Sequence, residues 1–268
     1  MLPLWVIDFI KKNFQNRFFY AKLSQIPVLG SVIEWMFFDN DDMVYLPKDN
    51  VMIEINQEIP FTNTVLPSQI VHRFIDEAKT HFLMNFCICR DSNKCQDYPI
   101  ELGCLFMGEA AAKIDPRLGR LVSSEEAHMH IIKAGEAGLV HLIGRNKLDA
   151  VWLDTGPDEK LMTVCNCCPC CCLWKMLPDL GSHISGKITR MEGVEVTVTD
   201  ACVGCGTCVD ACFVDAIKIV DGKAVISGEC RGCGRCVEAC PQKAITITID
   251  PQSIGKTIDR IESSVDVR

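Results

Sequence analysis

The sequence lacks the motifs that bind nucleotides or flavins. Its 268 residues contain no glycine-rich phosphate loop followed by Lys and Ser or Thr, and no G-x-G-x-x-G run after an expected strand. No nucleophile paired with a base stands out, so no catalytic residue is assigned. Basic residues are also too few for a nucleic-acid binder, because 27 Lys and Arg stand against 35 Asp and Glu, a net charge of −8. Such an acidic chain is better suited to docking on basic patches of partner proteins.

Long hydrophobic runs are missing from the apolar N-terminus. Within residues 1–38 the longest charge-free stretch, 23–33, has eleven residues, whereas a membrane-spanning helix needs about 20. Residues 1–10 also lack the basic region and the small-residue cleavage site of a secretory signal peptide. We therefore expect a cytoplasmic protein with no transmembrane span.

Residues 1–46 are expected to form an amphipathic N-terminal docking element. Ile7, Ile10, Phe14 and Phe18 share one helical face. Lys11, Lys12, Arg17 and Lys22 add local positive charge, with no acid between Phe9 and Ile33. Three interpretations stay open: the element packs on its own domain, docks on a partner subunit, or lies on a membrane surface.

The 18 cysteines fall into three groups, and none is isolated. Four lie at 87–104, six at 165–172 and eight at 202–240. A secreted disulfide-rich protein would be short and would space its cysteines along the chain. Dense groups indicate metal ligation by thiolates, which requires a reducing and, we expect, anaerobic cytoplasm.

The last eight cysteines form two copies of one ligand pattern, C-x2-C-x2-C-x3-C. The first run is Cys202, Cys205, Cys208 and Cys212, and the second is Cys230, Cys233, Cys236 and Cys240. Three thiolates on one loop reach three irons of a cubane [4Fe–4S] cluster, and in paired runs the fourth cysteine ligates the other cluster. We therefore assign one cluster to Cys202, Cys205, Cys208 and Cys240, and the other to Cys230, Cys233, Cys236 and Cys212. Zinc sites, the alternative, prefer two C-x2-C pairs.

Residues 196–250 resemble the bacterial-type ferredoxins that carry two [4Fe–4S] clusters. The resemblance rests on both cysteine runs and on glycines that match between them, such as Gly204 with Gly232. It implies a pseudo-symmetric α+β module that carries low-potential electrons and has no catalytic activity of its own. One departure is Phe213, which follows the first run where the family usually has proline. We expect Phe213 to shield one cluster and to alter its potential or docking without loss of the cluster.

The rest of the chain is expected to hold a mixed α/β cysteine-rich domain at 47–195 and a C-terminal tail at 251–268, so that the fold class is α+β. Pro67 and the Ser123-x-x-Glu126 capping box predict helix starts, and apolar or alternating stretches predict strands. The strands are expected at 51–55, 81–86, 161–164, 217–220 and 245–248, and the helices after Pro67, over 103–113 and from Ser123 to about Gly138.

Ten further cysteines follow two of these expected strands. They are Cys87, Cys89, Cys95 and Cys104, and then Cys165, Cys167, Cys168, Cys170, Cys171 and Cys172. If the two strands share a sheet, their ends bring both groups together. Adjacent residues of an extended chain point in opposite directions, so the six cysteines of 165–172 cannot all reach one ion. A subset is expected to ligate an additional [4Fe–4S] cluster, with a zinc site or a thiol relay as alternatives.

Two kinds of polar residue lie near these cysteines in the sequence. Arg90 either donates a hydrogen bond to a cluster sulfur or pairs with an acid such as Asp91. The histidines between residues 123 and 141 are expected to be surface or core residues, because the cysteines already supply enough metal ligands.

Roughly residues 50–250 also resemble a poorly characterised group of iron–sulfur proteins from anaerobes. In that group a CNCC-type cysteine segment precedes a dicluster ferredoxin module, so the resemblance implies one redox unit. The sequence favours an electron-transfer protein that relays low-potential electrons to a partner oxidoreductase. Two alternatives stay open: a redox enzyme whose upstream site reduces a small molecule or a disulfide, and a carrier of metal or clusters.

Overall fold

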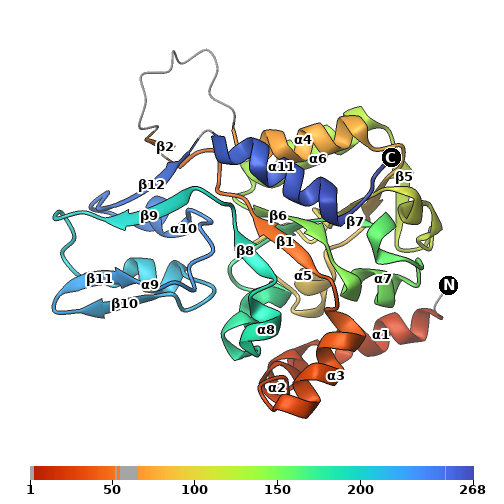
Figure 1. Cartoon of the computed structure of the whole chain (residues 1–268), viewed down its shortest axis with the longest axis horizontal. Helices are drawn as coiled ribbons and strands as arrows, with labels where there is room; N and C mark the ends of the chain where they lie inside the picture. Colours follow the sequence, from red (N-terminus) through yellow and green to blue (C-terminus); the bar gives the residue numbers. More distant parts are fainter. Residues whose placement is uncertain (1–2, 52, 55–65, 251) are drawn as a thin grey trace.

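The structure, a computed structural model, describes residues 3–51, 53–54, 66–250 and 252–268. It is a mixed α/β protein centred on a seven-stranded sheet (Figure 1). In spatial order the strands are β5 (Gly119–Val122), β3 (His81–Met84), β4 (Leu105–Met107), β7 (Met162–Cys167), β6 (Val140–Arg145), β1 (Asp42–Tyr45) and β8 (Ile188–Arg190). Neighbouring strands are antiparallel, except that β1 and β8 are parallel.

One face of the sheet is covered by three long helices, α4 (Ser68–Glu77), α6 (Ser124–Glu136) and α11 (Gln252–Ser264). Val44, Val164 and Leu105 point from the sheet into this core and meet Phe74 of α4 and Ile258 of α11. The start of α6 is the predicted capping box, because the hydroxyl of Ser123 accepts a hydrogen bond from the backbone N–H of Glu126 at 3.3 Å.

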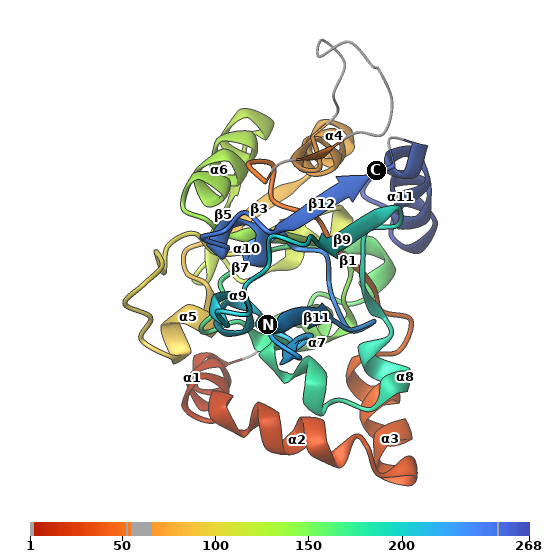
Figure 2. The same cartoon turned by 90° about the vertical axis from the view of Figure 1, so that its left-hand side faces the viewer.

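The opposite face carries the N-terminal helices and several short ones. They are α1 (Leu4–Lys12), η1 (Phe14–Asn16), α2 (Arg17–Leu23), α3 (Pro27–Phe37), α5 (Ile88–Ser92), η3 (Glu109–Lys113), α7 (Lys147–Leu153), η4 (Asp158–Lys160), η5 (Leu173–Asp179) and α8 (Ser182–Ser185). Alternate sheet residues such as Tyr45, Leu142 and Phe106 face this side. Figure 2 shows α1, α2 and α3 as a layer along the edge of the molecule that is at the bottom of that view.

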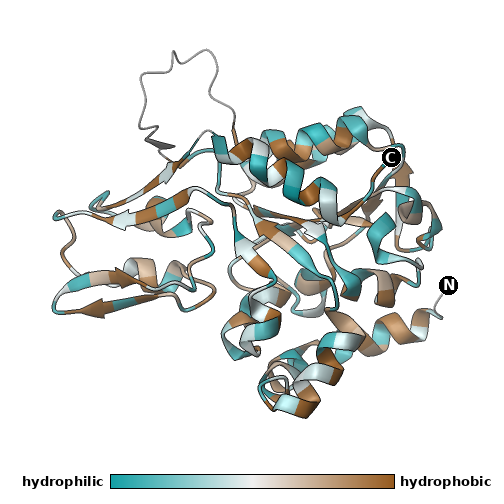
Figure 3. Ribbon diagram, viewed as in Figure 1, coloured by the Kyte–Doolittle hydropathy of each residue, from teal (hydrophilic) through white to brown (hydrophobic). Residues whose placement is uncertain are grey.

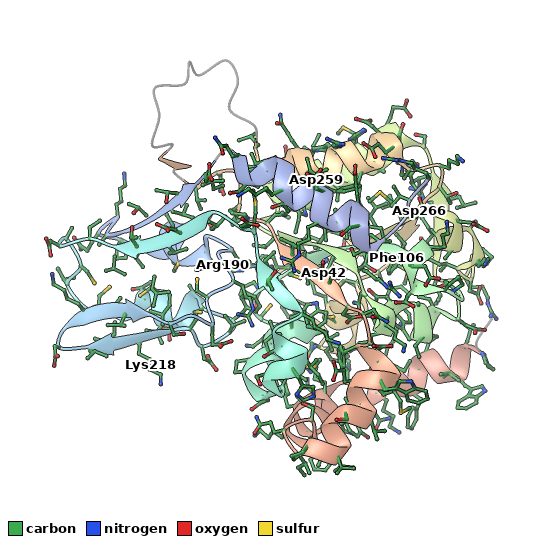
Figure 4. All side chains as sticks on the ribbon, in the orientation of Figure 1. Asp42, Phe106, Arg190, Lys218, Asp259 and Asp266 are labelled. Carbon is green, nitrogen blue, oxygen red and sulfur yellow. The ribbon has the colours of Figure 1, made fainter. Side chains whose placement is uncertain are left out.

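The C-terminal module forms a separate lobe beside the large sheet (Figure 1). It contains β9 (Val194–Val198), α9 (Thr207–Ala211), β10 (Ile217–Val220), β11 (Lys223–Ile226), α10 (Arg235–Ala239) and β12 (Ile245–Ile249). β10 and β11 form a hairpin, and β12 pairs with β9 and with the short strand β2 (Ile53–Glu54). Figure 4 labels Lys218 on the hairpin.

Most expected elements are present, but three stretches differ. Residues 103–113 contain β4 and η3 instead of one helix, because the apolar run at 105–107 pairs on both sides with neighbouring strands. β1 lies within 1–46 yet belongs to the large sheet. Residues 251–268 contain α11, which is attached to that sheet by hydrogen bonds from Arg260 to Asp42 (labelled in Figure 4) and to Thr189. Of the strand expected at 51–55, residues 52 and 55 lie outside the described residues.

The N-terminal helices carry many apolar residues (Figure 3), some of them buried against the protein and others exposed. Ile7, Phe14 and Ala21 are buried, whereas Trp5 and Trp35 are each 68% exposed. We call the exposed set the apolar face: Leu4, Trp5, Phe9, Phe19, Tyr20, Ile26, Val28, Leu29, Val32, Trp35 and Met36. None of the described helices combines the length and apolar character needed to cross a bilayer.

Candidate metal centres

Each cysteine loop of the C-terminal module is built around glycines in a left-handed conformation. Gly204 and Gly206 have φ of +66° and +86°, and Gly232 and Gly234 have φ of +62° and +84°. A Cβ at Gly204 would lie only 2.3 Å from the carbonyl oxygen of Gly222, so a side chain there is excluded. A short helix follows each loop, α9 after the first and α10 after the second. The two loops therefore repeat the same backbone course, 28 residues apart in the sequence.

The first loop meets the last cysteine of the second. Cys202, Cys205, Cys208 and Cys240 together line one small pocket. Burial raises the pKa of Cys208, and the nearby thiolates of Cys202, Cys240 and Cys205 raise it further. Backbone N–H groups point at the sulfurs, since Ala244 donates to Cys240 Sγ at 3.3 Å. Such N–H donors stabilise thiolates bound to iron.

The second loop meets Cys212 in the same way. Burial raises the pKa of Cys236, and the thiolates of Cys233, Cys230 and Cys212 add to that effect. The N–H of Ala216 donates to Cys212 Sγ at 3.3 Å, the counterpart of the contact at Cys240. Cys240 thus lies beside the first loop and Cys212 beside the second, and the ligand sets assigned from the repeat stay a prediction.

The ten upstream cysteines converge at one end of the large sheet. β3 and β7, the strands that precede them, are not neighbours, because β4 lies between them. Both strands are antiparallel to β4 and therefore run in the same direction, so their C-terminal ends lie at the same end of the sheet. Cys104 immediately precedes β4 and lies 3.9 Å from Cys165 of β7, measured between the two Sγ atoms.

Four of the ten form what we call the four-sulfur group: Cys95, Cys168, Cys170 and Cys171. Their sulfur atoms all lie within 4.8 Å of one another, and those of Cys95 and Cys170 are 3.6 Å apart. The N–H of Cys171 donates to Cys168 Sγ at 3.3 Å. Four thiolates bound to one ion at about 2.3 Å form a tetrahedron with edges of about 3.8 Å. The group therefore has the dimensions of a single-ion site.

The remaining six form the six-sulfur group: Cys87, Cys89, Cys104, Cys165, Cys167 and Cys172. Hydrogen bonds from the thiols of Cys165 and Cys172 lower the pKa of Cys167 well below its usual value, and the hydroxyl of Tyr45 adds a further contact at 3.7 Å. A hydrogen bond from Cys89 lowers the pKa of Cys87 to about 7. The cysteines of 165–172 thus divide between two groups. Cys165 and Cys167 of β7 join the six-sulfur group with Cys172, whereas Cys168, Cys170 and Cys171, which follow the strand, join the four-sulfur group.

Residues 201–245 match a family model described as a 4Fe-4S dicluster domain. This segment is a ferredoxin-type iron–sulfur module. The match covers the two cysteine runs of the repeat and none of the ten upstream cysteines. No curated protein and no solved structure matched the chain.

The ferredoxin module is joined to the six-sulfur group directly through Arg235 and indirectly through Phe213 and Tyr45. The ring of Phe213 packs on the ring of Tyr45, with centroids 5.3 Å apart. The guanidinium of Arg235, which is buried, donates to the carbonyl oxygen of Cys167 at 2.5 Å. Because Tyr45 also reaches Cys167 Sγ, both contacts end on the same cysteine. Sequence reasoning did not anticipate this connection, although the unusual Phe213 marked its position.

Arg90 is fully buried between the two upstream sulfur groups. Its guanidinium donates to the carbonyl oxygens of Asn166, at 2.7 Å, and Leu102. Burial alone lowers the pKa of Arg90, but nearby thiolates, led by Cys87, raise it above its usual value. Asp91, the acid considered as its partner, pairs with Lys11 instead, at 2.7 Å. A buried cation among thiolates is suited to an anionic metal–sulfur centre.

Asn166, between two cysteines of β7, is a structural hub that sequence reasoning missed. Its side chain points away from the sulfurs, where its amide donates to the carbonyl oxygen of Gly103 at 2.8 Å and its oxygen bonds His141 at 2.9 Å. His130 contacts the same Gly103 carbonyl at 2.9 Å. These two histidines thus fix the strand that carries Cys165 and Cys167, and neither belongs to the four-sulfur group.

A cavity of about 560 Å³ lies between the six-sulfur group and the N-terminal helices. All six cysteines of that group line it. Its other walls are mainly apolar and include Phe14, Ala21 and Phe38 from the N-terminal segment, Trp152 from α7 and Trp174 from η5. The sequence signalled the cysteines and the apolar helices separately, but only the fold places them around one space.

Proposed function

We propose that this chain is an iron–sulfur electron-transfer protein that relays low-potential electrons through two [4Fe–4S] clusters and a third, upstream metal centre. Cys202, Cys205, Cys208 and Cys240 would hold one cluster, and Cys230, Cys233, Cys236 and Cys212 the other. The paired loops, the N–H groups directed at sulfur and the ferredoxin-type match support this use of the cysteines. When bound, such clusters accept and release single electrons.

The contact between the ferredoxin module and the six-sulfur group carries the proposal. Cys212 is followed in the chain by Phe213, whose ring packs on the ring of Tyr45. The hydroxyl of Tyr45 in turn contacts Cys167 Sγ. Phe213 and Tyr45 are both buried, so no water layer separates the two sulfur-rich regions along this route. A free-standing carrier has no need of a buried contact with a second thiolate centre, whereas an internal relay requires one.

The four-sulfur group favours a single ion as the third centre. Its sulfur–sulfur distances are those of a tetrahedral tetrathiolate site, and a four-iron cube would hold its thiolates farther apart. Zinc or one iron therefore fits this group better than the additional [4Fe–4S] cluster expected from the sequence. An iron held there would take part in the relay, whereas a zinc ion, which has no redox chemistry, would be structural. An additional cluster, if present, would use thiolates of the six-sulfur group.

The exposed tip of the first ferredoxin loop is the surface best suited to a redox partner. Cys205 is exposed, and the neighbouring Val203 is 63% exposed. The segments around it carry Asp200, Asp210 of α9 and Asp221, of which Asp200 pairs with Lys223 at 2.8 Å, on a chain that is acidic overall. These features support docking by a partner oxidoreductase through a basic patch, in the reducing cytoplasm of an anaerobe.

The proposal is tested by measuring iron, zinc and acid-labile sulfide on one anaerobically purified sample. We expect about eight irons with matching sulfide, all reducible by dithionite, and one further zinc or iron per chain. Twelve or more irons without zinc would indicate a longer series of clusters. Far fewer than eight irons, with no cubane signal in Mössbauer spectra, would overturn the electron-transfer function.

A further inference from the structure

The cavity beside the six-sulfur group has the size and lining of a small-molecule site. Its volume of about 560 Å³ falls within the range of about 300–1,000 Å³ typical of ligand pockets. Aromatic rings line it, including those of Phe14, Phe38 and Trp152. Flat apolar molecules pack well against such rings.

Three buried polar atoms on residues of the cavity wall lack partners within the described part of the chain. They are the donors Nε of Arg17 and Nε of Arg90, and the acceptor Oδ1 of Asn146. All three residues are more than nine-tenths buried. An unpaired buried donor or acceptor is costly, so each indicates a ligand atom that completes its hydrogen bond. A ligand that fits the atoms of Arg17 and Asn146 has two oxidation states. In one state a carbonyl oxygen accepts a hydrogen bond from Arg17, and in the other a hydroxyl donates a hydrogen bond to Asn146.

The rim of the cavity is itself apolar. Phe9 and Tyr20 line the cavity and yet are 61% and 56% exposed, so they mark its opening. Both belong to the apolar face of the N-terminal helices. A lipid-soluble molecule can reach such an opening without crossing a polar surface.

From these features we propose that the cavity beneath α1–α3 binds a quinone-class acceptor and is the place where electrons leave the protein. The reaction is quinone + 2 electrons + 2 protons → quinol, in which both carbonyl oxygens become hydroxyls. The electrons come singly from the low-potential donor that reduces the ferredoxin module, so this step rests on the proposed function, and the protons come from solvent. The site makes the chain a quinone reductase in addition to a relay.

Binding is measured first, with duroquinone as the probe, because its ring is fully substituted and cannot alkylate thiols. Equilibrium dialysis of the whole anaerobic protein should show one saturable site. Ala21→Trp and Leu148→Trp both place an indole in the cavity and should weaken binding at least tenfold. Val28→Trp, on an exposed position outside the cavity, is the matched control and should bind as the wild type does. Wild-type affinity in both folded cavity variants would overturn the proposal.

Recognition of the carbonyl oxygen is measured with Arg17→Gln. Loss of one hydrogen bond from a charged donor should weaken duroquinone binding about tenfold or more. Binding of durene, which has the same methyl groups and no oxygen, should not change. An equal loss for both ligands would mean that Arg17 only shapes the cavity, and would contradict its assignment as the carbonyl donor.

Electron exit is measured by reoxidation of the dithionite-reduced protein, followed by the return of cluster absorbance. Leu148→Trp should slow reoxidation by duroquinone at least tenfold and leave reoxidation by ferricyanide, a hydrophilic oxidant, unchanged. A sample without reducible clusters that still binds duroquinone would refute the electron relay alone. A sample with reducible clusters and no duroquinone site would refute only the quinone site.

Discussion

The ring of Phe213 packs against the ring of Tyr45 at a centroid distance of 5.3 Å and an interplanar angle of 56°. Phe213 stands directly after the last cysteine of the first ferredoxin run, and Tyr45 ends the strand β1 of the large sheet. Proline at position 213 would provide no ring for this contact. The substitution that looked like a local departure from the ferredoxin pattern therefore joins two regions of the protein.

A double-mutant cycle should detect this contact. Tyr45→Leu and Phe213→Leu should each lower the free energy of unfolding, and the double variant should lose less than their sum. The difference should be about 0.5–1.5 kcal/mol, the usual coupling of a buried aromatic pair. Chemical unfolding under anaerobic conditions supplies the four values. A coupling energy of zero would show that the two rings make no mutual contribution.

Single cysteine substitutions should separate the metal centres. Cys95→Ser should remove about one metal ion per chain, because it breaks the four-sulfur group and leaves both ferredoxin loops intact. Cys104→Ser, in the six-sulfur group, is the matched control and should retain that ion. Metal analysis of the purified variants gives the counts. Loss of about four irons from Cys95→Ser would instead indicate a cube at this site.

The ferredoxin module was predictable from the sequence because its ligands lie close together along the chain. The cysteine spacing and the glycines at Gly204 and Gly232 specify the loops locally, and the capping box at Ser123 specifies a helix start in the same way. The division of the upstream cysteines was not predictable, because it depends on β4 entering the sheet between β3 and β7. A three-residue apolar run such as 105–107 has no periodicity that separates a strand from a helix.

The cavity escaped prediction for a similar reason. Arg17 looks like a surface residue of an amphipathic helix, but it is buried where α2 packs on η5 and lines the cavity beside the end of β7. Burial lowers the pKa of Arg17, while the nearby thiolates, led by Cys89, oppose that effect. The proximity of residues 17 and 89 depends on how distant helices and strands pack together in the fold, which no local sequence pattern encodes.

Asp41 should make the stability of the protein depend on pH. Its carboxylate accepts a hydrogen bond from the N–H of Lys147 at 2.7 Å, but Oδ2 has no partner within the described residues. Burial raises the pKa of Asp41 to about 8, from a usual value of 3.8. Between these values the folded protein holds a proton that the unfolded chain has released, so stability falls as pH rises toward 8.

Asp41→Asn removes this titration and keeps the acceptor for Lys147. Relative to the variant, the wild type should lose up to about 1.4 kcal/mol of unfolding free energy per pH unit between pH 6 and pH 8. Denaturant unfolding of both proteins at three pH values in this window checks the slope. Parallel curves for wild type and variant would contradict the assignment of a raised pKa.

The apolar face of the N-terminal helices should bind lipid bilayers at their surface. Tryptophan and tyrosine side chains favour the interfacial region of a membrane, and Trp5, Trp35 and Tyr20 are all exposed here.

Phosphatidylcholine vesicles should carry the wild-type protein upward in a flotation gradient, and the double variant Trp5→Ala, Trp35→Ala should reduce the bound fraction at least tenfold. Val203→Ala, an exposed apolar position on the ferredoxin module, should float like the wild type. Because the net charge is −8, anionic lipid should not strengthen binding. Wild-type protein that stays at the bottom of the gradient would instead leave a protein subunit as the partner that covers this face.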